Sequence, residues 1–242
     1  MSRIFITGDT HGDFERIEYF CNKAETSKDD LMIVLGDAGI NYYGGKRDKR
    51  LKAYLQQLPI TLFCIRGNHE MRPEDISNME EKEVFLQDMP ISGTVLYQPN
   101  YPDILYAKDG GSYNITINGE DRRVLTIGGA YSVDKQYRLS NGWHWFENEQ
   151  LNKEEKVSVE REIAAQPHYD IVLTHTVPIQ WEPVECFLPF IDQSTVDKTT
   201  EIWLSHIEEQ ITYKNWFAGH YHVDKIVDDK VRLMFNDIIE LK

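Results

Sequence analysis

The stretch IFITGDTHG, residues 4–12, decides the fold of this chain. An apolar run of strand length ends in glycine, and Asp9 and His11 follow at once, two positions apart. In extended backbone, side chains at positions i and i+2 point the same way, so these two can reach one cation together. Four more apolar runs in the chain end in metal-ligand chemistry. This repetition is the main sequence evidence for function.

A helix is expected after this first strand, over residues 13–24, because its apolar side chains recur on one helical stripe. A second apolar run, residues 31–35, then ends at Gly36 and Asp37. Two fully apolar strands separated by a helix predict a parallel βαβ unit. The carboxyl ends of both strands then lie on the same edge of the sheet, where open α/β sheets place their binding sites.

The rest of the chain alternates between predicted strands, helices and loops. Residues 91–127 change to a period of two, with a turn at Asn118 and Gly119, which indicates antiparallel sheet. Periodicity alone therefore predicts an α/β fold with a parallel core and an antiparallel portion. The other predicted elements are a glycine-rich loop at 38–45, a helix at 47–58, a strand at 60–65, a helical turn and loop at 73–90, an aromatic loop at 130–147, helices at 148–166 and 198–211, strands at 171–174 and 216–218, an ordered loop or cap at 176–197, and a closing hairpin of runs 225–227 and 231–235.

Length and charge limit the classes of protein that fit. The chain has 242 residues and no internal repeat, low-complexity tract or linker, so we expect a single domain over residues 1–242. The net charge is −14, from 26 basic and 40 acidic residues, and no basic patch stands out. We therefore expect no extended nucleic-acid track. Small anionic substrates are compatible with this charge, because bound dications can invert the local field.

The sequence predicts a soluble, cytoplasmic protein. No apolar segment approaches the length needed to cross a bilayer, and the first residues show no signal-peptide pattern, so we expect no membrane partner. Cys21, Cys64 and Cys186 are widely separated and odd in number, which predicts reduced thiols rather than disulfides. The oligomeric state cannot be read from the sequence.

Side chains able to bind metals collect at the predicted strand ends. They combine carboxylate, amide and imidazole groups, the mixture that a site for two first-row cations requires. The set is too large for one tetrahedral ion, whereas a carboxylate shared between two ions accommodates it. The alternative is that these residues are capping aspartates and buried histidines. The set comprises Asp9, His11, Asp37, Asn68 with its neighbour His69, His175, His220 and His222.

Five short blocks, in order, resemble those of the calcineurin-like metallophosphoesterase superfamily. They are GDTHG at 8–12, GD at 36–37, GNHE at 67–70, the histidine of Thr174-His175, and GHYH at 219–222. The resemblance implies the fold of this superfamily, a four-layer αββα sandwich of two mixed β-sheets flanked by helices. It also implies a metal-dependent phosphoric ester hydrolase.

The resemblance also implies a role for each residue. Asp9, His11 and His222 would hold one metal, Asn68, His175 and His220 the other, and Asp37 would bridge them. His69 would contact the substrate phosphate and assist the leaving group. The expected reaction is attack of a metal-activated hydroxide on the phosphorus of a phosphomonoester or phosphodiester, with nucleotides among the candidates. The expected cofactors are two divalent or mixed-valence ions of manganese, iron, zinc, nickel or cobalt, of which we favour manganese.

Substrate choice is less clearly indicated, because the blocks mix features of different branches. Arg66, directly before GNHE, looks like the serine/threonine phosphoprotein phosphatase branch, where arginines grip the phosphoryl group. However, GDAGINYYG at 36–44 lacks the VDRG of that branch, and GHYH is typical of phosphodiesterase-like branches. Arg66 is therefore either a catalytic phosphate contact or a member of a surface ion pair. A phosphoprotein phosphatase, a nuclease of short oligonucleotides and a catalytically silent scaffold remain alternative functions.

The loop at 130–147 supplies further candidates for substrate binding. Lys135 and Arg138 could bind a phosphate, and Trp143 could stack on a base or another ring, with Tyr131 nearby. The alternative is that the tryptophans pack beneath the loop and the cations are solvated, which we favour for Trp145. His144, outside the matched blocks, is expected to be an ordinary surface histidine.

Overall fold

The computed structural model describes residues 2–242. Within these residues, a 13-stranded sheet folds over at β5 (Ile91–Gln98) into two halves, and all of its strands except β4, which pairs only with β5, follow one hydrogen-bonded path. The start of β5 pairs with β7, whereas its later residues pair with β4 and β6. Gly93 lies at this change of partner with φ of +134°, and a Cβ there would press on the ring of Tyr113. Only glycine adopts this backbone readily, so Gly93 permits the bend.

The first half of the sheet is mostly parallel. Its central strands β1, β2, β3 and β6 run in the same direction, whereas β13, β4 and β5 are antiparallel to their neighbours. The strands are β1 (Ile4–Thr7), β2 (Leu31–Val34), β3 (Thr61–Cys64), β4 (Glu80–Val84), β6 (Tyr101–Tyr106) and β13 (Ile238–Glu240).

The second half combines the predicted antiparallel portion with a second parallel set. β7 pairs antiparallel with β8, and β8, β9, β10 and β12 then follow as parallel neighbours, with β11 antiparallel at the edge. The strands are β7 (Gly111–Ile117), β8 (Glu120–Ile127), β9 (Ile171–Thr174), β10 (Asn215–Ala218), β11 (Lys225–Ile226) and β12 (Val231–Leu233).

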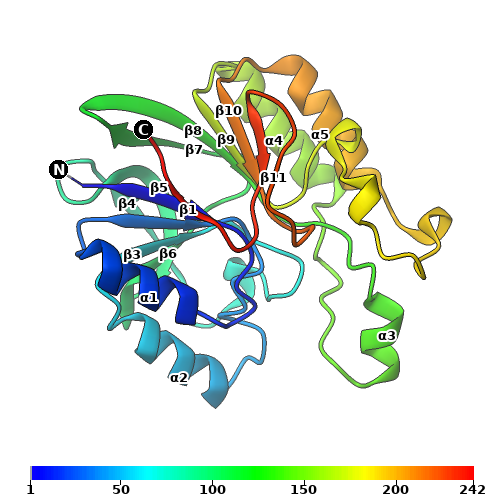
Figure 1. Cartoon of the computed structure of the whole chain (residues 1–242), viewed down its shortest axis with the longest axis horizontal. Coiled ribbons are helices and arrows are strands. Elements are labelled where there is room, and N and C mark those ends of the chain that lie inside the picture. The colour runs from blue at the N-terminus through cyan, green and yellow to red at the C-terminus, as the bar shows by residue number, and fades with distance from the viewer. Residues whose placement is uncertain (1) are drawn as a thin grey trace.

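Helices cover both outer faces (Figure 1). Helices α1 (Glu15–Ala24) and α2 (Lys46–Leu55) lie on the first half, and α4 (Lys153–Ala165) and α5 (Thr199–Gln210) lie on the second. The short helix α3 (Lys135–Ser140) stands away from the sheet on an arm of the chain, residues 130–147 (Figure 1). Single 3₁₀ turns occur at Pro73–Asp75, Ile179–Trp181, Val184–Cys186 and Gln193–Thr195.

Three apolar layers hold these elements together. An inner core joins the facing sides of the two halves and includes Ile6, Phe63 and Leu173. Separate outer cores join α1 and α2 to the first half and α4 and α5 to the second. Because side chains alternate between the two faces of a strand, Ile6 enters the inner core while Phe5 enters an outer one. This arrangement confirms the predicted four-layer αββα sandwich.

Some predictions of individual elements were wrong. The helical turn predicted at the start of 73–90 is present at Pro73–Asp75, but the rest of that segment contains β4 rather than only loop, and the loop at 130–147 contains α3. The closing hairpin is confirmed as β11 and β12, but the chain continues into β13, which pairs with β1. The charged sequence of β4, EEKEV, has little apolar pattern, and this strand forms because its backbone pairs with β5. No helix within residues 2–242 is long and apolar enough to span a membrane.

The substitution Leu173→Ala tests the inner core. Leu173 is fully buried between the two halves of the sheet, so truncation should lower the free energy of unfolding by about 2–5 kcal/mol. Urea unfolding followed by circular dichroism measures the change. The control Val157→Ala, on the exposed side of α4, should shift stability by no more than about 0.5 kcal/mol. Equal, small losses for both variants would contradict the packing of the two halves.

Candidate metal centre and adjoining cavities

Five parallel strands end at one edge of the folded sheet, and each delivers polar side chains there. In the first half, Asp9 and His11 follow β1, Asp37 follows β2 and Asn68 follows β3. The other histidines lie in the second half: His175 after β9, and His220 and His222 after β10. The fold therefore brings together seven predicted ligands that are separated by as many as 213 positions, from 9 to 222.

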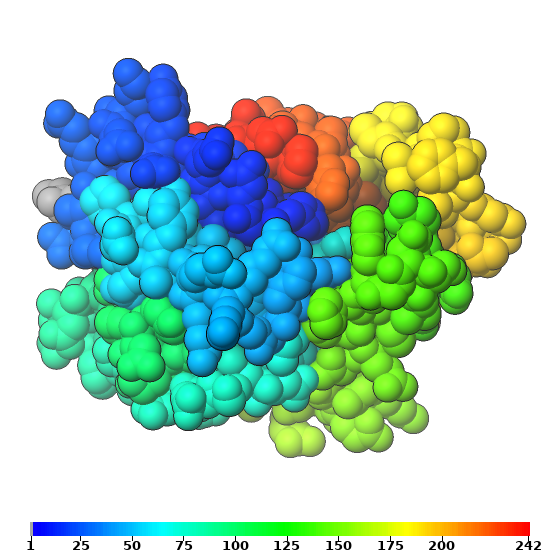
Figure 2. Space-filling model, turned by 90° about the horizontal axis from the view of Figure 1, so that it is seen from below, coloured from blue at the N-terminus to red at the C-terminus, as the bar shows by residue number. Residues whose placement is uncertain are grey.

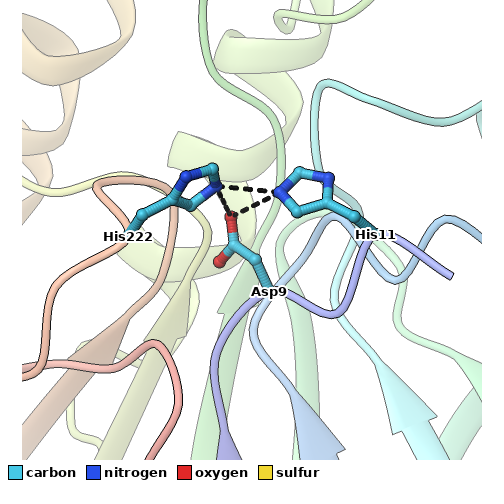
Figure 3. A group of neighbouring side chains, drawn as sticks. All are labelled: Asp9, His11 and His222. Atoms are coloured by element: carbon cyan, nitrogen blue, oxygen red, sulfur yellow. Dashed lines mark hydrogen bonds and ion pairs between the residues drawn. The ribbon is translucent and has the colours of Figure 1, made fainter. Parts of the chain in front are cut away.

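The first cluster contains Asp9, His11 and His222 (Figure 3). Asp9 Oδ2 lies 3.3 Å from His222 Nε2 and 3.8 Å from His11 Nε2, and the two Nε2 atoms are 2.8 Å apart. All three atoms face one point between the side chains (Figure 3). One carboxylate and two imidazoles converging in this way form a metal-binding geometry.

The second cluster gathers around Asp37 and His175. His175 Nε2 lies 3.5 Å from Asp37 Oδ1 and 2.8 Å from Asn68 Oδ1. His175 Nδ1 lies 2.8 Å from the Leu35 carbonyl, so a proton on Nδ1 leaves Nε2 directed toward the other ligands. The ring of His220 packs edge-on against that of His175, with centroids 5.0 Å apart.

Asp37 lies between the two clusters. Its carboxylate forms one group with Asp9 and His175, and another with His11 and His69. It therefore approaches members of both predicted ligand sets, as a bridging carboxylate must. Asp37 also accepts a hydrogen bond of 2.7 Å from the His69 amide, which fixes the position of Oδ1.

The backbone around the site is strained in a consistent way. His11, Asp37, His220 and His222 all have φ between 46° and 70°, in the left-handed region that side chains other than glycine seldom occupy. Such conformations cost about 1–3 kcal/mol each and concentrate at functional sites. These backbone conformations direct the side chains of four candidate ligands toward the centre.

Three glycines allow the ligands to approach this closely. A Cβ on Gly36 would overlap the ring of His175, one on Gly67 would overlap the carboxylate of Asp37, and one on Gly219 would overlap Asp9 Oδ1. The glycines of the GD, GNHE and GHYH blocks are therefore required because any larger side chain would collide with a candidate ligand.

The residues present fit a pair of cations. Asp9 Oδ2 is buried and has no hydrogen-bond partner among residues 2–242, although burying an unpaired carboxylate oxygen is costly. Asp9 and Asp37 are both almost fully buried and belong to the same cluster. The donors are carboxylate, amide and imidazole groups, which suit first-row transition metals. Bound cations would satisfy the orphaned oxygen and neutralise the two carboxylates.

The pKa shifts of the candidate ligands reflect the two carboxylates buried among them. Burial raises the pKa of Asp37, but the charges of His175 and His69 outweigh it, and the pKa lies well below its usual range. Burial lowers the pKa of His175, yet the carboxylate of Asp37 outweighs that effect and raises the pKa to about 9. Burial and the charge of His175 lower the pKa of His220 to about 3. The pKa values of these two adjacent histidines are thus shifted in opposite directions by their surroundings.

His69 is placed differently from the ligand histidines. Its ring lies at the rim of the centre, 5.3 Å from the ring of His11, and its Nε2 is 3.6 Å from Asp134 Oδ1. Burial lowers the pKa of His69, but the carboxylates of Asp37 and Asp134 outweigh this and raise the pKa above its ordinary value. The side chain borders both cavities described below, so a substrate in either cavity can reach it.

A buried network holds Asn68 in one orientation. Asn68 Nδ2 donates to Ser132 Oγ at 2.9 Å, and Ser132 Oγ donates to Glu149 Oε2 at 2.5 Å. Arg138 also donates to Ser132 Oγ, at 3.2 Å. Because the amide nitrogen of Asn68 is held by Ser132, its oxygen faces His175 and the centre.

The structure does not place Arg66 where a phosphate contact needs it. The guanidinium is 2% exposed, donates from Nε to Asp109 Oδ2 at 3.0 Å and from Nη1 to the Glu149 carbonyl at 2.6 Å, and borders neither cavity beside the centre. The expected catalytic contact through Arg66 is inconsistent with this position. The expected ion pair is present, but it is buried rather than at the surface, because Arg66 follows β3 into the interior.

Two cavities flank the centre and meet at His69 and Asp134. The first, of about 580 Å³, lies between the segment 39–51 and the arm, and it includes Arg138 and Trp143. The second, of about 490 Å³, lies beneath the segment 182–198 and includes Tyr131. Both volumes are in the range of small-molecule sites. Tyr131, Arg138 and Trp143 thus line cavities beside the centre, and their contact with a substrate stays a prediction.

The other candidates of the arm are placed as follows. Lys135 borders neither cavity, and its Nζ lies 3.8 Å from the ring centroid of Trp145, so its ammonium is engaged with that ring. Trp145 is half-buried, as expected for a residue that packs beneath the loop. His144, expected to be an ordinary surface residue, borders the first cavity.

Sequence reasoning missed the residues that surround and support the ligands. Asp134, Ser132 and Glu149 belong to no recognisable spacing, and their roles come from contacts with His69 and Asn68. Tyr42 and Tyr43 belong to the predicted glycine-rich loop at 38–45, and its aromatic composition is the sequence feature that indicates a cavity wall there.

Comparison with known proteins identifies the family. Residues 2–224 match the family model described as calcineurin-like phosphoesterase. Because this match covers most of the chain, the chain belongs to the calcineurin-like phosphoesterase family. Members of this family usually bind divalent metals, and the chain carries groups of residues suited to them. No curated protein sequence matches the chain.

Solved structures share the fold at low sequence identity. One is 12% identical with a TM-score of 0.53 and covers 96% of this chain and 89% of its own. Phosphopantetheinyl hydrolase from Mycobacterium tuberculosis is 16% identical with a TM-score of 0.50, covering 97% of this chain and 88% of its own. These similarities concern the fold alone.

The substitution Gly36→Ala tests the steric argument. Gly36 has φ of +92°, and the added methyl group would displace His175, so we expect metal affinity to fall by at least about tenfold. Titration calorimetry with Mn²⁺ measures the affinity. Gly119→Ala is a matched control, since Gly119 has φ of +81° and nothing within 4 Å of an added Cβ. Both variants should lose stability, but only Gly36→Ala should lose metal. An unchanged affinity in Gly36→Ala would show that His175 is not a ligand.

Proposed function

We propose that this chain is a dinuclear metal-dependent phosphoesterase that hydrolyses a small phosphomonoester or phosphodiester. The observation that carries the proposal is the position of Asp37, whose buried carboxylate approaches members of both ligand sets at the meeting point of five strand ends. Asp9, His11 and His222 would hold one ion, and Asn68, His175 and His220 the other. When bound, two such ions lower the pKa of a water and clamp the oxygens of a phosphate.

The chain's own residues supply orientation and proton transfer. The backbone amides of His69 and His220 hold the carboxylates of Asp37 and Asp9 through hydrogen bonds of 2.7 and 2.9 Å, which keep the ligand atoms in place before substrate arrives. The imidazole of His69, at the rim of the centre, would donate a proton to the departing alkoxide oxygen. Asp134 faces His69 Nε2 at 3.6 Å and favours its protonated form.

A small ester is favoured over a phosphoprotein. Arg66 was the feature that most resembled the serine/threonine phosphatase branch, and its guanidinium is buried against Asp109. Turnover of bis-p-nitrophenyl phosphate, of p-nitrophenyl phosphate and of a phosphoserine peptide separates the two functions. We expect one of the small esters to be hydrolysed faster than the peptide, whereas a strong preference for the peptide would favour the phosphatase.

Removal of metal should abolish hydrolysis. Dialysis against a chelator would take away the groups that activate water, so kcat should fall to background and return when Mn²⁺ is added. Elemental analysis should give two ions per chain in the active protein. The variant His220→Ala should retain fewer ions than the wild type, since it removes a ligand of one of them. Full activity in protein proven free of metal would exclude the proposed reaction.

The substitution His69→Gln separates a proton donor from a ligand. Loss of general acid catalysis should reduce kcat by about 10²–10⁴-fold, while the metal content stays at the wild-type level. The control His206→Gln changes an exposed histidine on α5 and should leave kcat unchanged. If His69→Gln also lost metal, His69 would be a ligand or a structural residue instead.

A further inference from the structure

The first cavity has two walls from distant parts of the chain. One wall is the segment 39–51, which leads into α2, and the other is the arm that carries α3. Figure 2 shows the segment that includes α3 lying beside the segment that begins α2. The two walls are joined where Tyr42 Oη donates to the His144 carbonyl at 3.3 Å and the Tyr42 ring packs against that of His144. These contacts between Tyr42 and His144 hold the two walls of the cavity together.

Aromatic rings line this cavity and leave large surfaces to solvent. Trp143 is 54% exposed and Tyr43 is 42% exposed, although both border the cavity. Trp143 is steadied by an edge contact with Tyr137 at 5.5 Å between centroids, and Arg47 stacks on the Tyr43 ring at 4.1 Å. Exposed rings held in fixed orientations are the usual stacking platforms for flat heteroaromatic groups.

A buried cation lies in the same cavity. Arg138 is 1% exposed, and its Nε and Nη2 atoms have no hydrogen-bond partner among residues 2–242. Only Nη1 is engaged, with Ser132, and the Asp134 carboxylate lies 3.8 Å away. Burying a guanidinium whose N–H groups are unpaired costs free energy unless a ligand accepts hydrogen bonds from them. Because the fork of a guanidinium matches phosphate oxygens, the missing partner is best supplied by a phosphate group.

We propose that this cavity binds a nucleotide, which deepens the proposed function and rests on it. The phosphate would lie on the side of His11 and His69 and accept hydrogen bonds from Arg138, while the base would stack on Trp143 or Tyr43. A nucleotide is the class of phosphate ester that carries a flat, hydrogen-bonding ring and a phosphate on one small molecule. A volume of about 580 Å³ suits a ligand of this size. The second cavity also has aromatic rings, those of Tyr131, Phe187 and Tyr221, but no arginine among residues 2–242 borders it. Its lysine, Lys198, already pairs with Glu182 at 2.6 Å.

Equilibrium binding tests this inference without requiring turnover. Titration calorimetry on the metal-loaded protein would compare adenosine 5′-monophosphate, ribose 5-phosphate and O-phosphotyrosine. Base stacking should make the nucleotide bind at least about fivefold more tightly than either of the other probes. The variant Trp143→Ala should abolish most of that preference while ribose 5-phosphate binds as before. The control Tyr19→Ala removes a 65% exposed ring from α1 and should retain the preference for the nucleotide.

A second variant tests the phosphate contact. Arg138→Lys retains a buried cation but loses the fork, so the affinity for adenosine 5′-monophosphate should fall while that for adenosine stays the same. Circular dichroism would establish that this variant is folded.

The outcomes separate the two proposals. Equal binding of the nucleotide and ribose 5-phosphate, equally tight binding of O-phosphotyrosine, or an unaffected preference in Trp143→Ala would overturn nucleotide binding in this cavity, even if small esters are hydrolysed. Nucleotide binding that depends on Trp143, in a protein that hydrolyses none of the small esters, would support the site and refute the proposed hydrolase.

Discussion

The burial of two neighbouring carboxylates, Asp9 and Asp37, is the constraint on which the rest of the structure depends. Placing two anions together away from water is unfavourable unless hydrogen bonds and positive charges compensate. Each carboxylate accepts an amide hydrogen bond from a loop after another strand, Asp9 from His220 and Asp37 from His69. The first of these bonds joins the two halves of the sheet at the site. Bound cations, held by neutral imidazoles, would supply the compensating positive charge.

This constraint accounts for the unusual backbone of the strand-end loops. The chain must leave each strand and turn its next side chain back toward a common point, which requires left-handed conformations at His11, Asp37, His220 and His222. The same convergence leaves no room for a side chain at Gly36, Gly67 or Gly219. Parallel strands make it feasible, because their carboxyl ends lie on one edge. Strain at the centre is offset by the three apolar layers that hold the strands.

The surroundings of the centre divide into a rigid side and a substrate side. The ligands stand on buried strands, whereas the cavities are walled by the arm and by the segment 182–198, both rich in exposed apolar side chains. The arm is nevertheless tied to the centre, since Ser132 and Glu149 orient Asn68 and Arg138 joins the same network. A ligand that engages Arg138 therefore touches the network that orients a candidate metal ligand. Substrate recognition and metal geometry are physically connected through these few hydrogen bonds.

From the sequence, periodicity determined an α/β fold with a parallel core and an antiparallel portion, and the resemblance of five blocks to a known family implied the layered sandwich and the ligand roles. Apolar strands and helical stripes are local patterns that can be read from the sequence. Asp9, Asp37 and His175 stand at strand ends, so parallel pairing of those strands predicts that they are neighbours. Tertiary structure alone decided that Arg66 is buried against Asp109, that Asp134 faces His69 and that Arg138 lines a cavity. It also decided the strands β4 and β13, which form by pairing with β5 and β1 rather than by an apolar pattern. The physical reason is that periodicity reports which face of its own element a residue occupies, whereas its partner across the fold depends on how distant elements pack.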